Sequence, residues 1–263
     1  MSLPVFVCLK WGERYPAREA NTLFRALSAL MSEPVRFVCL TDVARGLDDG
    51  IEPMPIPDFA LERARWGHGM WPKLSVFKPG MFEPGTPVML LDLDLVITRD
   101  LAPVLEHLRR TGGLHIIHDW HDTHERWFPK WFPNERRSNS SVVGFIAGEQ
   151  AQIWDAFHDK SWDILRPQIN DQEFIHRHAE NRHFWPDGWM LSFKKSLAFH
   201  FPVNLLREPS RPPEGSFIVC FHGRPDPEDC AGPPFRMWSG GEKFGFFPVS
   251  WIKRYRNAYA PPE

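Results

Sequence analysis

Short apolar runs and amphipathic segments alternate along the N-terminal part of this chain. Residues 4–9 (PVFVCL) and 35–40 (VRFVCL) are apolar, rich in β-branched side chains and of strand length. Segment 17–31 between them predicts a helix with one apolar face, because its apolar residues recur at helical spacing: Ala20, Leu23, Phe24, Leu27 and Leu30. A strand, a helix and a strand in this order predict a parallel pair joined by a right-handed crossover, and therefore an α/β sheet.

Similar patterns place the remaining elements. We predict further strands at 87–91, 114–117, 141–147 and 216–221, and helices at 70–77, 101–110, 150–158, 171–178 and 248–259. Segment 44–60 is rich in Gly, Pro and Asp and is predicted to be a loop. No internal repeat is visible, and 263 residues fit one large domain better than two. The expected fold is therefore a single α/β domain, residues 1–263, with a mostly parallel central sheet flanked by helices.

Composition excludes some classes of function. The formal net charge of −2 provides no broad basic field, so no nucleic-acid partner is expected. No stretch reaches the ~18 apolar residues of a membrane span, and the N-terminus lacks the pattern of a signal peptide. Four cysteines without Cys-x-x-Cys spacing are typical of reduced thiols. Together these features predict a cytoplasmic protein.

The most informative string is VMLLDLDLVI, residues 88–97. Its apolar start predicts a buried strand that leads into Asp92 and Asp94. On extended backbone these two side chains project to the same side while Leu93 faces the core. Two carboxylates held together are costly to bury unless a cation lies between them. A hard divalent ion such as Mn²⁺ or Mg²⁺ would serve, at the carboxyl end of a strand, where open α/β sheets bind ligands.

Two other interpretations of this string stay open. Asp-x-Asp is a common tripeptide, so the pair can be two ordinary carboxylates at a solvated strand end. The string also resembles the haloacid-dehalogenase phosphatases, in which the first Asp, here Asp92, is a nucleophile. That motif belongs on the first strand of the fold. Here a full strand–helix–strand unit precedes it, and this position argues against a phosphatase.

Five short strings in a fixed order carry a family resemblance: VCLKWGERYP, LLDLDLVI, NSSVVGF, NDQEFI and IVCFHG. They span residues 7–223 and resemble the GT-A-fold glycosyltransferases, within them the family-8, glycogenin-like retaining enzymes and their bacterial relatives. The resemblance implies transfer of a sugar, with retention, from a nucleotide-sugar donor such as a uridine diphosphate sugar to a saccharide or lipid-linked glycan acceptor. Residues 1–110 would form the nucleotide-binding half, and residues 111–263 the acceptor side and the C-terminal tail.

The resemblance also implies a metal and diphosphate site. His222, at the end of a late strand, would join Asp92 and Asp94 as a ligand of Mn²⁺ or Mg²⁺; the alternative is a histidine at an ordinary strand end. Gly223 matches the family, but a Lys that usually follows it and contacts the diphosphate is absent. Arg224 stands nearby and can supply positive charge, and this departure leaves the diphosphate contact in question.

Further site residues follow from the same resemblance. Asn139 and Ser140, just before a predicted strand, would lie beside the sugar, or would simply favour a turn. Asp171 and Gln172 would lie near the reacting centre, although Asn170 or Asp171 can equally cap a helix.

Three more residues complete the expected donor site. Trp11 and Tyr15 would contact the nucleobase, although packing in the core explains them as well. Lys73 would meet phosphate, with solvation at the surface as its alternative.

Three remaining features are weighed against the fold. His115, His118, His121 and His124 recur every third residue, but a strand at 114–117 would send the first two to opposite faces, which argues against a zinc site. Two Trp-rich segments, 118–133 and 185–195, suit the neighbourhood of the acceptor, and Lys194 or Lys195 can approach an anionic group. The aromatic and basic tail, 235–256, can make peripheral contact with an anionic membrane or can cover the sheet, and we favour the second.

Overall fold

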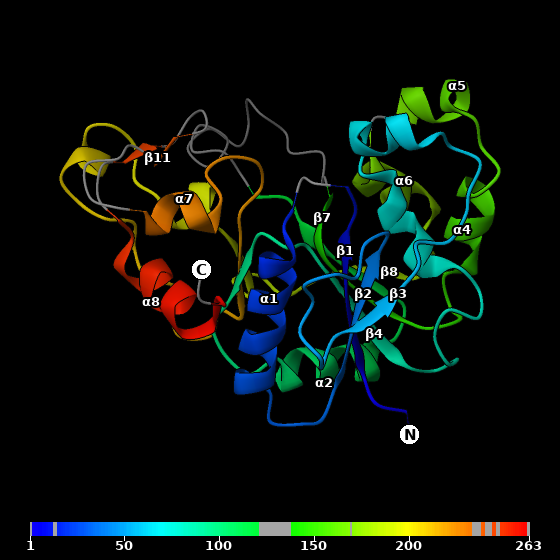
Figure 1. Cartoon of the computed structure of the whole chain (residues 1–263), viewed down its shortest axis with the longest axis horizontal. Helices are drawn as coiled ribbons and strands as arrows, with labels where there is room; N and C mark the ends of the chain where they lie inside the picture. The colour runs from blue at the N-terminus through cyan, green and yellow to red at the C-terminus, as the bar shows by residue number, and fades with distance from the viewer. Residues whose placement is uncertain are drawn as a thin grey trace.

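A seven-stranded sheet forms the centre of the molecule (Figure 1). The structure is a computed structural model that describes residues 2–12, 15–120, 138–168, 170–232, 238–239, 244–245 and 248–261. The strands lie in the order β3-β2-β1-β4-β7-β6-β8. Their bounds are β1 Val5–Lys10, β2 Arg36–Thr41, β3 Glu52–Met54, β4 Pro87–Leu91, β6 Leu114–His118, β7 Ser138–Ile146 and β8 Arg182–Phe184. Within this sheet β7 runs antiparallel to both of its neighbours and the other pairs are parallel, so the mostly parallel sheet predicted from the sequence is confirmed.

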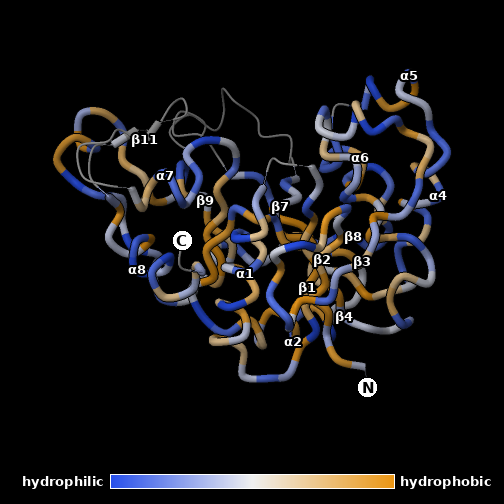
Figure 2. The backbone as a smooth tube through the Cα atoms, in the orientation of Figure 1, coloured by the Kyte–Doolittle hydropathy of each residue, from blue (hydrophilic) through white to orange (hydrophobic). Residues whose placement is uncertain are grey.

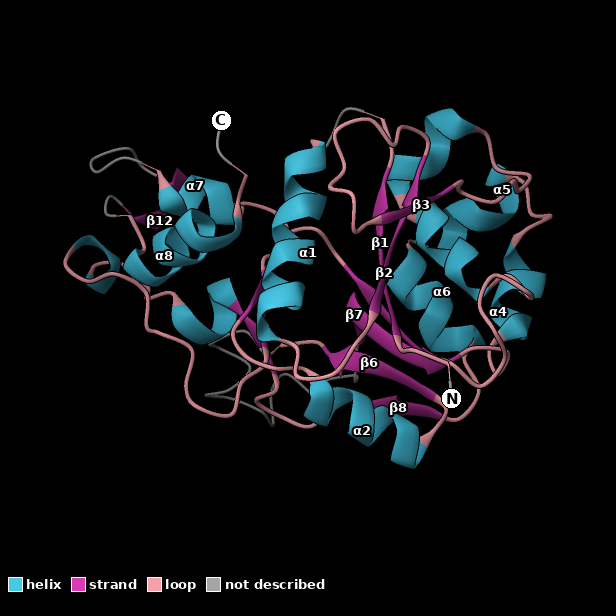
Figure 3. Cartoon of the chain, turned by 60° about the horizontal axis from the view of Figure 1, so that its bottom comes forward, coloured by secondary structure: helices cyan, strands magenta, loops and turns pink. Residues whose placement is uncertain are grey.

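Helices cover both faces of this sheet. Figure 3 shows α1 (Ala17–Leu30) and α2 (Ala102–Thr111) on one side, and α4 (Ala151–Phe157), α5 (Trp162–Leu165) and α6 (Asp171–His178) on the other. Phe6 and Cys8 of β1 belong to the core under α1 and α2, whereas Val5, Val7 and Leu9 belong to the opposite core. A strand covered on both faces is expected to be apolar throughout, which is why β1 is apolar from Val5 to Leu9 and polar only at its last residue, Lys10 (Figure 2).

A smaller sheet adjoins the first. It consists of β5 (Leu95–Ile97), β10 (Ile218–Cys220) and β9 (Met190–Ser192), in that order, and a two-stranded ribbon of β11 (Trp238–Ser239) and β12 (Phe244–Gly245) lies beyond it. Helices α7 (Pro227–Ala231) and α8 (Ser250–Tyr259) belong to the same end of the molecule (Figure 1). Short 3-10 turns are η1 (Arg63–His68), η2 (Trp71–Phe77), η3 (Arg166–Gln168) and η5 (Val203–Leu205), and η4 (Phe193–Leu197) is a π-helical turn.

Several predicted elements were wrong in extent or type. Segment 44–60 is not all loop, because Glu52–Met54 pairs with β2. Strand β7 begins at Ser138 rather than at 141, which places Asn139 and Ser140 inside the strand. The strand expected at 216–221 is limited to Ile218–Cys220, and the helix expected at 70–77 is a 3-10 turn. Strands β3, β5, β8 and β9, of three residues each, escaped prediction because pairing with a neighbour, and not local pattern, makes them strands.

Helix α8 covers the smaller sheet and α1 and does not present its whole basic face to solvent. Its Trp251, Ile252 and Tyr255 are buried, and Arg256 is 5% exposed between Glu19 of α1 and Glu228 of α7. Arg256 Nη2 donates to Glu19 Oε1 over 3.0 Å. This packing agrees with the sheet-covering interpretation of the tail, although most of segment 233–247 lies outside the described residues. Within the described residues, no helix combines the length and apolarity needed to cross a bilayer.

Replacing Arg256 by Ala is expected to lower the free energy of unfolding by about 3 kcal/mol, because Glu19 would lose the cation that compensates its burial. Chemical denaturation followed by circular dichroism measures this loss. Arg254→Ala, on the exposed side of the same helix, serves as the control and should change stability by less than ~0.5 kcal/mol. Equal stability of the two variants would show that the three-helix ion pair does not hold α8 in place.

His115 is a buried neutral imidazole on β6. It is 0% exposed, its Nε2 lies 3.0 Å from Thr111 Oγ1, and its ring packs against His107, His183 and Trp185. His118 contacts Phe184 instead, and His121 and His124 lie outside the described residues. Burial, followed by the charges of His183 and His107, lowers the pKa of His115 to about 3.

This lowered pKa predicts a loss of stability in acid. The unfolded chain takes up a proton near pH 6.5 but the folded chain does not, so stability is present above pH 6.5 and falls as the pH drops toward 3. Between pH 7 and pH 4 the contribution of His115 should be about 3 kcal/mol. Urea denaturation at several pH values should show a flatter dependence for His115→Gln than for wild type. An exposed control, His68→Gln, should follow the wild type.

Candidate functional site

The order of the strands creates a site at the carboxyl ends of β1 and β4. From β1 the chain proceeds outward through β2 and β3, then returns to the other side of β1 as β4. Connections therefore leave β1 and β4 in opposite directions, and a crevice opens between them. A cavity of about 340 Å³ lies there. It is lined by all but one of the residues predicted for the site: Trp11, Tyr15, Lys73, Asp92, Asp94, Asn139, Ser140, Asp171, Gln172, His222 and Gly223.

The aspartate pair lies in the link between the two sheets. Strand β4 ends at Leu91 and β5 begins at Leu95, so Asp92 and Asp94 occupy a bend and not the extended strand assumed from the sequence. Leu93 between them is 6% exposed and packs in the core, as expected. Backbone hydrogen bonds fix the bend, from Asp92 N to Ser141 O (3.0 Å) and from Phe221 N to Asp94 O (3.1 Å). The backbone of Asp92 is thereby tied to β7 of the large sheet, and the backbone of Asp94 to the residue that follows β10 of the smaller sheet.

Negative charge is in excess around Asp94. Burial raises the pKa of this carboxyl well above its usual value, and the charges of Asp92 and Asp226 raise it further. Lys73 acts in the opposite direction but does not reverse the shift. A carboxylate in this position is stabilised by an additional cation, so the pair is suited to a divalent metal ion.

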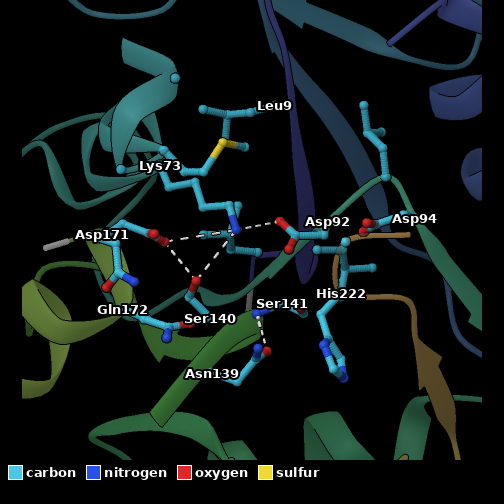
Figure 4. A pocket seen from close by; sticks show the side chains of 18 of the residues that line it. Leu9, Lys73, Asp92, Asp94, Asn139, Ser140, Ser141, Asp171, Gln172 and His222 are labelled. Atoms are coloured by element: carbon cyan, nitrogen blue, oxygen red, sulfur yellow. Dashed lines mark hydrogen bonds and ion pairs between the residues drawn. The ribbon is translucent and has the colours of Figure 1, made fainter. Parts of the chain in front are cut away.

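Lys73 links the aspartate pair to Asp171. Its ammonium lies 2.6 Å from Asp92 Oδ1 and 3.8 Å from Asp171 Oδ2, and it donates to Ser140 Oγ over 3.4 Å (Figure 4). Ser140 Oγ in turn donates to Asp171 Oδ2 over 2.6 Å. The side chain is 6% exposed, so the surface alternative for Lys73 was wrong. Burial alone would lower the pKa of Lys73, but Asp92 and Asp171 outweigh it and the net shift is upward, which keeps the ammonium charged.

His222 belongs to a different set of contacts. Its Nε2 lies 2.7 Å from Ser192 Oγ, and its ring stacks on Trp120 with centroids 5.2 Å apart. Figure 4 shows the ring pointing away from the two carboxylates. In this conformation the imidazole does not point toward a metal ion that Asp92 and Asp94 would hold. Among the described residues, no group of three or more His, Cys, Asp or Glu side chains is gathered closely enough to hold a metal.

Arg224 is the one predicted site residue outside the main cavity. Its guanidinium lies 2.7 Å from Asp229 Oδ2 and 3.3 Å from Asp226 Oδ2, and its side chain is 61% exposed. It lines an adjoining recess of about 140 Å³ with Tyr15, Asp94, Gly223 and Asp226. Arg224 is therefore already paired with the carboxylates of Asp226 and Asp229.

Asn139, Ser140, Asp171 and Gln172 border the opposite side of the cavity. Asn139 Oδ1 accepts a hydrogen bond from Ser141 N (3.0 Å), and Asn170 caps α6 by accepting from Glu173 N (3.0 Å). The capping alternative thus holds for Asn170, which leaves the carboxylate of Asp171 to face Ser140 and Lys73. Burial raises the pKa of Asp171 even though Lys73 opposes the shift.

Two aromatic side chains stand at the mouth of the cavity. Trp11 follows β1 and meets Trp66 edge to face, with centroids 6.4 Å apart. Tyr15 borders both the main cavity and the smaller recess. Both side chains are partly exposed, so neither is fully used by the core. Aromatic side chains of this kind can contact a flat ring.

A second cavity, of about 360 Å³, lies beyond His222. Its lining includes Asp119, Trp120, Trp185, Asp187 and Lys195. Trp120 is held by a hydrogen bond from its Nε1 to Met190 O (2.9 Å), and Lys195 Nζ donates to Trp120 O (2.9 Å). Since Trp120 also stacks on His222, these two rings form the wall between the cavities. The sequence suggested only that these Trp-rich segments lie near an acceptor; their contact with His222 depends on the fold.

Comparisons with known proteins identify the fold. No family model matches the sequence, and no curated protein matches it either. Solved structures do match over almost the whole chain. An active-site mutant of LgtC has a TM-score of 0.61 at 11% identity, covering 98% of this chain and 97% of that one. The galactosyltransferase LgtC in complex with donor and acceptor sugar analogues has a TM-score of 0.58 at 12% identity, covering 98% of each chain.

A third similar structure belongs to a longer protein. The bifunctional glycosyltransferase WbbM, in its apo form, has a TM-score of 0.57 at 11% identity, with 98% of this chain covering 50% of WbbM. At identities this low the likeness concerns the fold alone. The chain is therefore a single α/β domain with the GT-A fold that these glycosyltransferases share.

Proposed function

We propose that this protein transfers a sugar from a nucleoside diphosphate sugar, with a uridine nucleotide as the expected donor, to a saccharide or glycoconjugate acceptor. One observation carries the proposal. A carboxylate pair with excess negative charge opens into a cavity of about 340 Å³ at the switch point of a GT-A fold. A metal-bound diphosphate has the charge and the oxygen ligands that such a pair would need.

Asp92 and Asp94 would hold Mn²⁺ or Mg²⁺. When bound, the ion would act as a Lewis acid toward the departing nucleoside diphosphate. His222 would join the ligands by turning its ring away from Ser192, to which it is now bonded. The charge of the carboxylate pair fits the ion, which would compete with the Lys73 ammonium for Asp92; the imidazole fits only after this rotation.

The other side chains would orient the donor. Trp11 and Tyr15 would stack against the nucleobase, and Asn139 would bind sugar hydroxyls. Asp171 accepts a hydrogen bond from Ser140 and lies close to Lys73. We therefore propose that Asp171 positions the sugar and forms no covalent bond with the sugar. The amide of Gln172, also in the cavity lining, would lie on the reacting face, which fits transfer with retention.

The second cavity would receive the acceptor. Trp120 and Trp185 offer aromatic faces for a sugar ring, while Asp119, Asp187 and Lys195 offer polar partners for hydroxyl groups. The position of this cavity across the Trp120–His222 wall from the donor site supports this role. Peripheral contact with a membrane would suit a lipid-linked acceptor.

Thermal denaturation with Mn²⁺ and a panel of nucleotides tests the proposal without knowledge of the acceptor. A ligand that binds the folded state alone raises stability by RT ln(1 + [L]/Kd). UDP should raise the melting temperature of the wild type in the presence of Mn²⁺, and less so with EDTA. No response to any nucleotide with metal would contradict the proposal. Binding of UDP-sugars without release of UDP, even with acceptors, would favour a non-catalytic sugar-nucleotide binder instead.

A phosphatase based on Asp92 is less favoured by the geometry. Asp92 follows the fourth strand along the chain, and its Oδ1 is 2.6 Å from the Lys73 ammonium. Release of phosphate from simple esters, with inhibition by fluoroberyllate, would be the observation that revives it.

A further inference from the structure

The charges around the aspartate pair raise the question of which cation meets the diphosphate. Among the described residues that line the two adjoining cavities, Lys73 and Arg224 are the lysine and arginine side chains. Lys73 is bound to Asp92 and faces Asp171. Arg224 is bound to Asp229 and Asp226, and its side chain is 61% exposed. The ammonium of Lys73 and the guanidinium of Arg224 therefore both lie against carboxylates.

The end of β9 directs a different lysine toward the site. Strands β9 and β10 run parallel, with Ser192 opposite Cys220. Beyond this pair, Phe193 stacks on Phe221 with centroids 4.5 Å apart, and Ser192 Oγ contacts His222 Nε2. The segments that follow β9 and β10 thus continue side by side past the sheet. Lys194 therefore lies beside the segment that contains His222 and Gly223.

Gly223 receives this lysine. A Cβ built on Gly223 would lie 3.7 Å from the Nζ of Lys194, so the ammonium packs directly against the glycine backbone. Gly223 has a φ of 70°, which favours glycine, and it lines both the main cavity and the smaller recess next to Asp94. Because no side chain projects from this position, the ammonium lies directly beside a residue that lines both cavities.

The turn that carries Lys194 is fixed at its start. Ser192 Oγ accepts a hydrogen bond from Lys195 N (3.0 Å), which closes the first turn of η4. Lys195, one position later, is directed elsewhere and donates to Trp120 O beside the second cavity. The two adjacent lysines therefore point in different directions, Lys194 toward Gly223 and Lys195 toward the second cavity.

We propose that Lys194 binds the diphosphate of the nucleotide, and that Arg224 instead stabilises the loop through Asp226 and Asp229. This inference rests on the proposed function, since it names the residue that recognises the phosphates of the same donor. A charge-assisted hydrogen bond of this kind corresponds to about a 10- to 100-fold effect on affinity.

Isothermal titration of UDP with Mn²⁺ into full-length variants tests the assignment. Lys194→Ala should weaken UDP binding by about 10- to 100-fold. Lys253→Ala, at an exposed lysine of α8, and Arg224→Ala should stay within about threefold of wild type, and Lys194→Arg should keep most of the affinity because it keeps the charge. Uridine, which lacks phosphates and whose binding can be followed by ligand-observed NMR, should bind wild type and Lys194→Ala equally.

The outcomes separate this inference from the proposal on which it rests. If wild type binds UDP and Lys194→Ala binds it equally well, the assignment of Lys194 is overturned alone. A loss confined to Arg224→Ala would transfer the role to Arg224. If Lys194→Ala lost affinity for uridine and for UDP equally, Lys194 would not act on the diphosphate, and its assignment would also be overturned. If wild type binds no UDP with metal, the proposed function itself fails.

Discussion

An Asp94→Asn variant is expected to lose Mn²⁺-dependent binding of UDP by about 100-fold or more. The substitution keeps the size of the side chain and removes the charge that a divalent ion would neutralise. Because burial and the charges of Asp92 and Asp226 raise the pKa of this carboxyl, removing its charge should leave the apo protein equally stable or more stable. The expected signature is thus a folded protein that no longer responds to metal and nucleotide.

Titration calorimetry with UDP, in Mn²⁺ and in EDTA, measures this effect. Asp163→Asn, an exposed carboxylate on α5, is the matched control and should bind as wild type does. Undiminished metal-dependent binding by Asp94→Asn would remove Asp94 from the metal site. Equal affinities of wild type in Mn²⁺ and in EDTA would remove the metal itself from the proposal.

Replacing Lys73 by Met is expected to cost about 3–5 kcal/mol of stability in the absence of metal. Lys73 lies within 4 Å of both Asp92 and Asp171, and its side chain is 6% exposed. Its loss would leave these carboxylates facing one another without compensation. An isosteric apolar side chain would fill the same space, so the cost would come from charge and not from a cavity.

Metal should partly reverse this loss. Mn²⁺ would occupy the carboxylate site without competition from the ammonium, so it should raise the melting temperature of Lys73→Met more than that of wild type. Lys78→Met, the same substitution at an exposed lysine, should neither lose stability nor gain this response. A Lys73→Met protein as stable as wild type would show that the ammonium is not needed to hold Asp92 and Asp171 together.

Much of the candidate site could be predicted because its chemistry is local in sequence. Asp92 and Asp94 follow an apolar run, and any buried strand that ends in two carboxylates brings them to one edge of a sheet. The order of the surrounding strings then indicated the fold, and the structures of similar fold confirm it. What could not be predicted is which partner each charge takes. Lys73 and Arg224 are both basic, yet the first is bound inside the cavity and the second is taken by Asp226 and Asp229 outside it.

The sequence by itself determined the alternation of buried strands and amphipathic helices, the covered parallel sheet, and the position of the carboxylate pair, because these depend on period and neighbourhood along the chain. Only the tertiary structure decided that β3 is a strand, that β7 runs antiparallel, that His222 rests on Trp120 and Ser192, and that Lys194 lies against Gly223. These contacts join residues far apart in sequence. Their existence depends on how two sheets meet, which no local pattern of residues specifies.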